Sequence, residues 1–316
     1  MSTSVHRFCA IVTLLVGVPG SSPAQATLHS ERLELAHDKP FVMVMVNGKG
    51  PFRFVIDTGT GGQAFVTSEL AEQLGLPFAG QANLSDPSGQ GRQSVPMVLI
   101  QSLQLAGIEF TGIKAAVHPL GEGDGSYQGL LGFTLFRDYL LTLDFPKREM
   151  RLASGSLAPD DEQSVLPFRM PDGLPIVSLR IGGFEIDAQI DSGGSGLSLP
   201  EQFASRLKFV SDPAAFGTGQ SLSTRFLIKA AKLAADVHLG AYTFKQPFVE
   251  VNRAFPLANF GSVPMQGFAL TFDQKNGLVR FEASQKTLSL SATPAPMHLL
   301  NAPAQKRTDL ALVPVD

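Results

Sequence analysis

The sequence has almost no sulfur chemistry available to it. Its 316 residues include a single cysteine, Cys9, which lies in a segment that we expect to be removed. The mature chain would then contain no disulfide, no thiolate nucleophile and no thiolate metal site. Its stability must come from a hydrophobic core, and 44% hydrophobic residues are enough to form one.

The sequence also lacks a large excess of charge of either sign. It has 25 Lys and Arg residues against 28 Asp and Glu, and its basic residues form no cluster. This balance argues against a nucleic-acid partner. The six histidines are scattered, and no H-E-x-x-H, G-x-S-x-G or P-loop motif occurs. We therefore expect no metal and no cofactor, and we expect a monomer.

The first 26 residues have the pattern of a secretory signal peptide. Residues 1–7 carry one positive charge, residues 8–18 are apolar, and Ala24-Gln25-Ala26 fits the small-x-small cleavage rule. The alternative is an uncleaved membrane anchor, but the apolar run is too short to span a bilayer comfortably, and no later run is longer. We expect cleavage after Ala26 and a secreted or periplasmic protein without a stable membrane span.

The rest of the chain contains one long internal repeat. In each half a glycine precedes an aspartate by nine positions, and these aspartates, Asp57 and Asp191, are 134 positions apart. Further along, Asp144 and Asp273 each precede an arginine by seven positions. Two matched blocks in the same order indicate a tandem duplication, which predicts two similar lobes about a pseudo-twofold axis.

The sequence predicts mainly β-strand in both halves. Abundant Gly and Pro, 23 Phe residues and short Val- and Ile-rich runs favour short strands broken by turns, so we expect an all-β, bilobal fold. Helical spacing occurs at 68–74, with a counterpart at 203–207. The turn-rich segment 86–92 predicts the tip of a long hairpin. The expected segments are a signal peptide (1–26), an N-terminal lobe (27–152), a linker (153–164), a C-terminal lobe (165–283) and a low-order tail (284–316).

The residues with the clearest chemistry stand at the head of each repeat. The two blocks read Ile56-Asp57-Thr58-Gly59-Thr60 and Ile190-Asp191-Ser192-Gly193-Gly194. An acid that directly follows an apolar strand is costly to bury unless it is paired. If the axis brings the loops together, the two carboxyl groups share a proton, so that one can activate water and the other can protonate a carbonyl oxygen. The glycines allow backbone N–H groups to approach the carboxyls, and the hydroxyls of Thr58 and Ser192 can bond across to the opposite loop.

With these motifs the chain resembles the aspartic protease superfamily of pepsin-like and retropepsin-like enzymes. The resemblance rests on Asp57-Thr58-Gly59-Thr60, Asp191-Ser192-Gly193 and Gly129-Leu130-Leu131-Gly132. It implies an aspartic endopeptidase with catalytic residues Asp57 and Asp191, a pepsin-like bilobal fold, and a flap at 86–92 over an extended peptide or protein substrate. It also implies that Leu130, Leu131 and Gly132 support the first loop, as Phe260 and Gly261 support the second.

The chain departs from the family pattern at two places in its second half. Gly194 stands where a hydroxyl residue is usual, and Asn259 stands where the supporting element is usually apolar. Because Gly194 has no hydroxyl, we expect Asp191 to lack one hydrogen bond, and the enzyme to have a mildly acidic rather than a gastric pH optimum. The presumed flap also has no tyrosine, unlike that of pepsin-type enzymes.

Three other interpretations remain. The two aspartates could simply cap their own turns, although their duplication disfavours this; for Asp144 and Asp273 a role in hairpin structure is the favoured interpretation. Residues 59–64 formally satisfy the G-x-G-x-x-A dinucleotide pattern, but the second repeat does not keep that spacing. The chain could also be a catalytically silent peptide-binding protein with the same fold.

Overall fold

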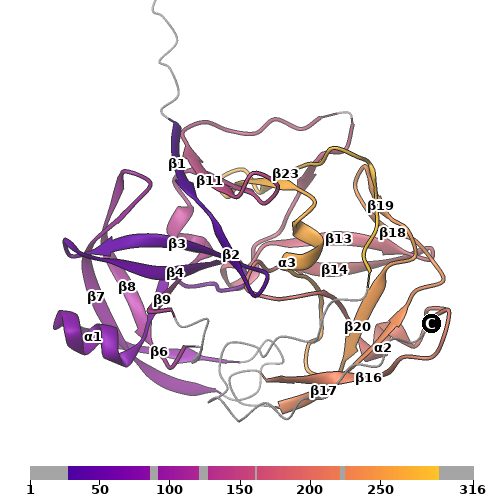
Figure 1. Ribbon diagram of the computed structural model, residues 1–316, viewed down its shortest axis with the longest axis horizontal. Coiled ribbons are helices and arrows are strands. Elements are labelled where there is room, and N and C mark those ends of the chain that lie inside the picture. The colour runs from indigo at the N-terminus through magenta and orange to yellow at the C-terminus, as the bar shows by residue number, and fades with distance from the viewer. Residues whose placement is uncertain (1–27, 86–91, 121–126, 161, 221–224, 292–316) are drawn as a thin grey trace, which may run out of the picture.

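The computed structural model describes residues 28–85, 92–120, 127–160, 162–220 and 225–291. The expected signal peptide, almost all of the expected flap tip and most of the expected tail lie outside these residues. The described chain is an all-β, bilobal fold with few and short helices, as predicted (Figure 1). None of the described helices is long and apolar enough to cross a membrane.

The N-terminal lobe is built on an eight-stranded sheet, which lies on the left in Figure 1. In spatial order its strands are β2 (Glu34–Ala36), β3 (Lys39–Val46), β4 (Lys49–Asp57), β9 (Gly129–Gly132), β5 (Ala64–Val66), β8 (Ile108–Val117), β7 (Gln93–Leu105) and β6 (Phe78–Leu84). The antiparallel pair β6–β7 forms the arms of the predicted long hairpin.

The C-terminal lobe is built on a ten-stranded sheet, on the right in Figure 1. Its order is β16 (Ala214–Gln220), β17 (Arg225–Lys232), β20 (Phe248–Asn252), β15 (Leu197–Pro200), β21 (Ala258–Phe260), β14 (Phe184–Ile190), β13 (Ile176–Ile181), β18 (Val237–Leu239), β19 (Tyr242–Phe244) and β24 (Thr287–Leu288). Strand β24 pairs with β19 in parallel, although it lies in the segment 284–316 that was expected to have low order. That prediction is therefore wrong for the first residues of the segment.

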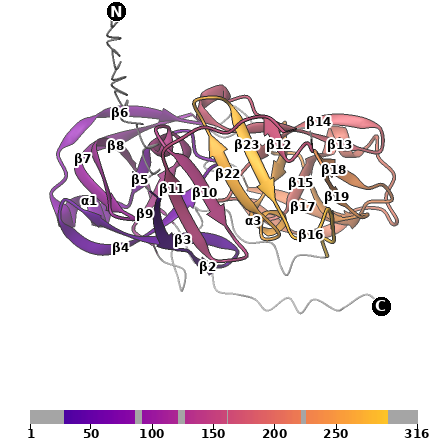
Figure 2. The same cartoon turned by 90° about the horizontal axis from the view of Figure 1, so that it is seen from above.

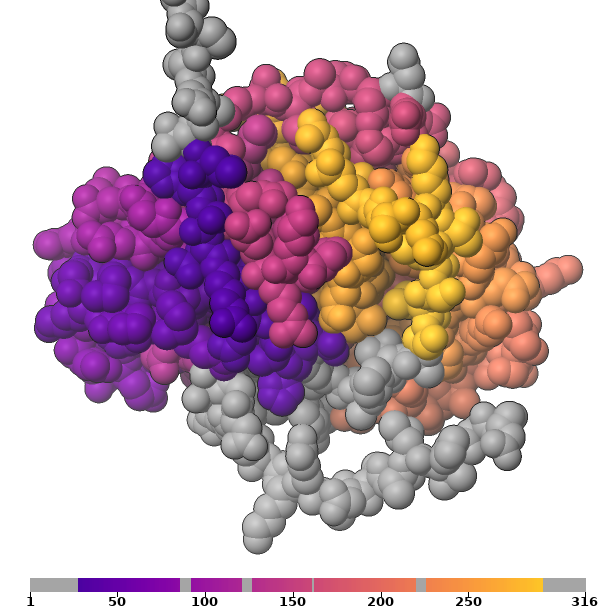
Figure 3. Space-filling model, turned by 45° about the horizontal axis from the view of Figure 1, so that its top comes forward, coloured from indigo at the N-terminus to yellow at the C-terminus, as the bar shows by residue number. Residues whose placement is uncertain are grey.

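A third sheet of six strands joins the two halves (Figure 2). Its order is β1 (Leu28–Arg32), β11 (Glu149–Ala153), β10 (Leu140–Asp144), β22 (Ala269–Asp273), β23 (Leu278–Glu282) and β12 (Val165–Pro167). Strands β10 and β22 occupy equivalent places in the repeat, and they pair with each other in antiparallel register. Figure 3 shows the residues of both halves packed against one another along this junction.

The pairing of β10 with β22 marks a local twofold axis. Thr142 lies directly opposite Thr271, and their hydroxyl oxygens are 2.9 Å apart, within hydrogen-bond distance. A residue that faces its own repeat counterpart must lie close to such an axis. Nearby, Asp144 and Asp273 accept hydrogen bonds from the backbone N–H groups of their own turns, which confirms that they belong to hairpins.

The longest described helix forms where its sequence predicts it. Helix α1 (Ser68–Leu74) begins after Thr67, whose hydroxyl caps the Leu70 N–H group, and ends at Gly75 in a left-handed conformation. The expected counterpart at 203–207 is misplaced. Helix α2 (Glu201–Ala204) starts earlier because β15 ends at Pro200, whose ring cannot continue the strand ladder. The third α-helix is α3 (Ser262–Met265), and two short 3₁₀ turns are η1 (Phe133–Phe136) and η2 (Pro171–Gly173).

One hydrophobic core runs through both lobes and the connecting sheet. At the junction, Phe133 of the N-terminal half packs edge-on against Phe272 of the C-terminal half, with ring centroids 5.1 Å apart. Phe168 contacts both rings. Such a continuous core holds the two lobes in a fixed relation, which a site built from both of them requires.

Candidate active site

Each repeat aspartate stands at the end of a buried strand beside a glycine-containing element. Asp57 ends β4 and lies opposite Gly132 of β9, and the Asp191 N–H group donates to the Phe260 carbonyl of β21. A side chain at Gly132 or Gly261 would collide with backbone carbonyl groups of the neighbouring loop. The elements 130–132 and 260–261 therefore lie against the two aspartate loops.

The two loops are locked together by Thr58 and Ser192. The Thr58 N–H group donates to the Ser192 hydroxyl and the Ser192 N–H group donates to the Thr58 hydroxyl, both at 3.0 Å. Each hydroxyl in turn donates across the interface, Thr58 to the Ile190 carbonyl at 2.8 Å and Ser192 to the Ile56 carbonyl at 2.7 Å. Both side chains are fully buried, so the four bonds are shielded from water and fix the loops in register.

Each carboxyl group reaches across this interface to the opposite loop. Gly59 lies against the carboxyl of Asp191, and Gly193 lies against the carboxyl of Asp57, so closely that a Cβ atom at either glycine would collide with it. Only glycine permits this approach. The structure thus brings together Asp57 and Asp191, which are far apart in sequence, at the point where the lobes join.

Asp57 accepts two hydrogen bonds from its own loop. The Gly59 N–H group donates to Oδ1 at 2.8 Å, and the Thr60 hydroxyl donates to Oδ2 at 3.0 Å. The side chain is buried, and this burial, followed by the charge of Asp191, raises the pKa of Asp57 to about 7. Lys39 and the two hydrogen bonds act in the opposite direction. At mildly acidic pH Asp57 therefore holds a proton.

Asp191 is held differently, and the expected loss of a hydrogen bond is wrong. The N–H groups of Gly193 and Gly194 donate to Oδ1 at 3.0 and 2.8 Å. The remaining oxygen, Oδ2, accepts a 2.7 Å bond from the Asn259 side-chain amide. The amide of Asn259 therefore does for Asp191 what the hydroxyl of Thr60 does for Asp57.

The two departures from the family pattern are in fact one feature. A Cβ atom at Gly194 would lie 2.8 Å from the Asn259 amide nitrogen and 2.7 Å from Asp191 Oδ2. Glycine at 194 leaves the space that the Asn259 amide fills. Each substitution looks like a loss when it is read alone, and only their contact in space shows that they compensate for each other.

Sequence reasoning missed one charged residue at this site. Lys39, the first residue of β3, is only 5% exposed, and its ammonium group donates to the Gly193 carbonyl of the opposite lobe. Burial lowers the pKa of Lys39, while the charges of Asp57, Asp191 and Asp38 act to raise it. The only signal in the sequence was a lysine directly before an apolar strand. No group of three or more potential metal ligands occurs in the described part of the chain.

Residues 42–135 match a family model described as aspartyl protease. The match covers 94 of the 316 residues, so it is this part of the chain that is similar to the family. The matched region contains Asp57 and the element 130–132, while Asp191 lies beyond it, so the second half of the site rests on the contacts described above.

Solved structures also match this chain. One is the crystal structure of a retropepsin-like aspartic protease from Rickettsia conorii, with 23% sequence identity and a TM-score of 0.31. That match covers 41% of this chain and 94% of the other. No curated protein matches the chain.

Proposed function

We propose that the protein is an aspartic endopeptidase that hydrolyses peptide bonds with a water molecule activated between Asp57 and Asp191. The observation that carries the proposal is the reciprocal packing of each carboxyl group against the glycine of the opposite loop. Two carboxyls held in this way favour a state with one shared proton, which is the state that acid–base hydrolysis requires.

The hydrogen bonds support different resting roles for the two acids. Asp57, with its pKa raised to about 7, holds the proton and donates it to the carbonyl oxygen of the scissile bond. Asp191 accepts three N–H hydrogen bonds, a set suited to a carboxylate, and takes the proton from the attacking water. Water adds to the carbonyl carbon, and the amine leaves after protonation by the pair, without a covalent intermediate.

The same arrangement supports a working range at mildly acidic to neutral pH, because Asp57 remains protonated up to about pH 7. As the resemblance to aspartic proteases implies, we propose an extended peptide that lies across both lobes as the substrate. The signal pattern in residues 1–26 adds the proposal that the enzyme acts outside the cytoplasm, as a monomer.

The proposal is tested with a mixed peptide library. The purified protein and its Asp57→Asn variant are incubated with the library at pH 5.5, with and without pepstatin, and products are identified by mass spectrometry. We expect pepstatin-sensitive cleavage that falls by about 10²–10⁴-fold in the variant, the range for loss of an acid–base group. Equal products from both proteins would remove the proposal. Peptide binding without turnover by the wild type would support a silent peptide-binding protein instead.

A further inference from the structure

The C-terminal lobe contains a pocket directly beside Asp191. Its wall includes Gly194 and Asn259, two residues whose N–H groups bind the Asp191 carboxyl. The cavity volume is about 30 Å³, room for the polar end of one side chain. The side chains that define the pocket are Phe226, Ile228, Glu250, Asn252, Phe255 and Asn259.

Glu250 is an acid that folding alone does not explain. It lies on β20 between β15 and β17, opposite Ser198 and Ala230, so its backbone is fixed in the middle of a sheet. The residue is only 7% exposed, and its Oε1 atom has no hydrogen-bond partner among the described residues. Burial raises the pKa of Glu250 to about 7. An unpartnered buried carboxyl is destabilising, and such groups concentrate at functional sites.

A second acceptor in the same pocket is also free. The Asn259 side-chain nitrogen binds Asp191, but its buried oxygen has no partner within the described part of the chain. The pocket therefore presents two unused acceptors, one of which becomes negatively charged near neutral pH. A ligand that satisfies both must carry several hydrogen-bond donors and, preferably, a positive charge.

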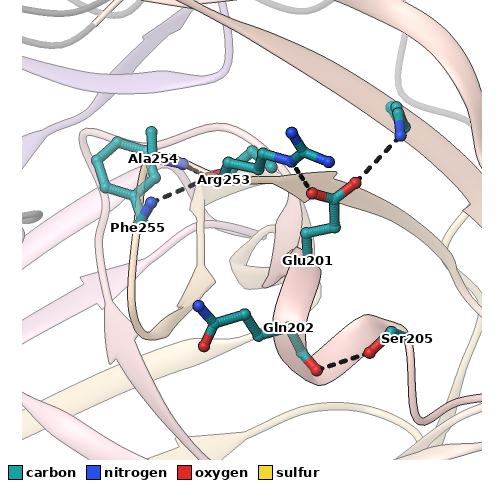
Figure 4. A network of polar contacts seen from close by, with 8 residues as sticks. Glu201, Gln202, Ser205, Arg253, Ala254 and Phe255 are labelled. Carbon is teal, nitrogen blue, oxygen red and sulfur yellow. Dashed lines mark hydrogen bonds and ion pairs between the residues drawn. The ribbon is translucent and has the colours of Figure 1, made fainter.

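Two cations of this region are bound to another acid. Lys229 of β17 donates to one oxygen of Glu201 at 3.1 Å, and the Arg253 guanidinium donates to the other (Figure 4). Glu201 thus pairs with one cation of β17 and with one of the loop that follows β20. The Asn252 side-chain oxygen accepts bonds from the N–H groups of Ala254 and Phe255, at 3.0 and 3.1 Å, and so fixes the loop that carries Phe255.

The aromatic wall suits the stem of a long cationic side chain. Phe226 and Phe255 pack edge to face with ring centroids 5.3 Å apart. Such a wall accepts methylene groups and also attracts a cation to the face of a ring. The pocket combines an apolar wall with a buried acid at the position next to the candidate catalytic residue.

We propose that Glu250 is a specificity-determining residue, and that this pocket takes a lysine or arginine side chain of the peptide substrate. The cation binds the Glu250 carboxylate and donates to the Asn259 oxygen, while the stem lies along the two phenylalanines. This inference rests on the proposed peptidase function, because it names the class of peptide that the site selects.

The test compares matched peptides on matched variants at pH 6.5. A library randomised over three positions on each side of the cleaved bond first identifies the position at which Lys or Arg is enriched. At that position, kcat/KM is measured for lysine and for norleucine, which keeps the apolar stem without the cation. The proteins are the wild type, Glu250→Gln, and Glu185→Gln as a control that removes an exposed carboxylate from β14 in the same lobe.

We expect the wild type to prefer lysine over norleucine by about tenfold or more, equivalent to about 1.4 kcal/mol. Glu250→Gln should bring the ratio close to one while it still cleaves the norleucine peptide, and Glu185→Gln should keep the wild-type ratio. No enrichment of basic residues, or an unchanged ratio in Glu250→Gln, overturns the inference while leaving the peptidase proposal intact.

A binding measurement separates the two proposals if no peptide is cleaved. Fluorescence anisotropy of labelled lysine and norleucine peptides reports on the pocket without turnover. Tighter binding of the lysine peptide that is lost in Glu250→Gln supports the pocket even where the peptidase proposal fails. Equal binding of both peptides to the wild type refutes the proposed role of the pocket.

Discussion

Replacing Asp57 by asparagine should change how the stability of the protein depends on pH. In the folded wild type the pKa of Asp57 is raised from 3.8 to about 7, first by burial and then by the charge of Asp191. The unfolded chain keeps the ordinary value. Between these pH values the folded state binds a proton that the unfolded state has already lost, so the free energy of unfolding falls as the pH rises.

The size of this effect follows from the interval between the two pKa values. Each pH unit corresponds to about 1.4 kcal/mol, and the interval from 3.8 to about 7 spans roughly three units. The wild type should therefore lose up to about 4 kcal/mol from this one group between pH 4 and pH 7. The asparagine side chain of the Asp57→Asn variant cannot titrate, so the variant should gain stability relative to the wild type by about 1.4 kcal/mol per pH unit over this range.

The assay is urea unfolding of both proteins at pH 4, 5, 6, 7 and 8. Titrating groups that do not interact with Asp57 are common to both proteins and largely cancel in the difference between the two curves. Glu185→Gln, which removes an exposed carboxylate, serves as the control. A difference curve that stays flat from pH 4 to pH 7 would refute the reasoning, because the folded protein would then hold no extra proton at Asp57.

Three further tests concern the contacts around the two acids. Asn259→Leu removes the donor to Asp191 Oδ2 and should lower kcat by about 10–100-fold, the equivalent of a charged hydrogen bond of about 1.5–3 kcal/mol. Adding Gly194→Thr should restore part of the lost kcat. If the double variant is as stable as the single variant but regains no activity, Gly194 and Asn259 do not compensate for each other. Lys39→Met removes a charge that lowers the pKa of Asp57, so the alkaline limb of the kcat/KM profile should move to higher pH; an unmoved limb would contradict this. Ser192→Ala leaves buried backbone groups of both loops unsatisfied and should lower the free energy of unfolding in urea by about 1–3 kcal/mol. A change within experimental error would show that the hydrogen bonds between the lobes contribute little to stability.

The pattern of the sequence predicts much of this fold because it depends on short-range rules. Short apolar runs predict β3 and β4, and helical spacing at 68–74 predicts α1 with its bounds. The repeat also predicts that Asp57 and Asp191 stand in equivalent loops. Residues at equivalent positions of two lobes come close together when the lobes face each other across an axis. The loops of Asp57 and Asp191 are close together for this reason.

The features that escaped prediction depend on contacts between segments far apart in the chain. The pairing of Gly194 with Asn259 becomes visible only when β21 lies beside the second aspartate loop. Lys39 reads as an ordinary charged residue until β3 is placed against the opposite lobe. Glu250 lies in a strand whose neighbours in the sheet come from elsewhere in the chain, so its burial has no local signal.

The most direct test of the acid pair is a double-mutant comparison on one cleaved peptide. The value of kcat/KM is measured for the wild type, Asp57→Asn, Asp191→Asn and the double variant at pH 5.5. If the two carboxyls work as a unit on one water, each single variant loses nearly as much activity as the double variant. If the fold-losses in kcat/KM of the two single variants multiply to give that of the double variant, or if one single variant retains the wild-type kcat/KM, the two carboxyls do not share a role.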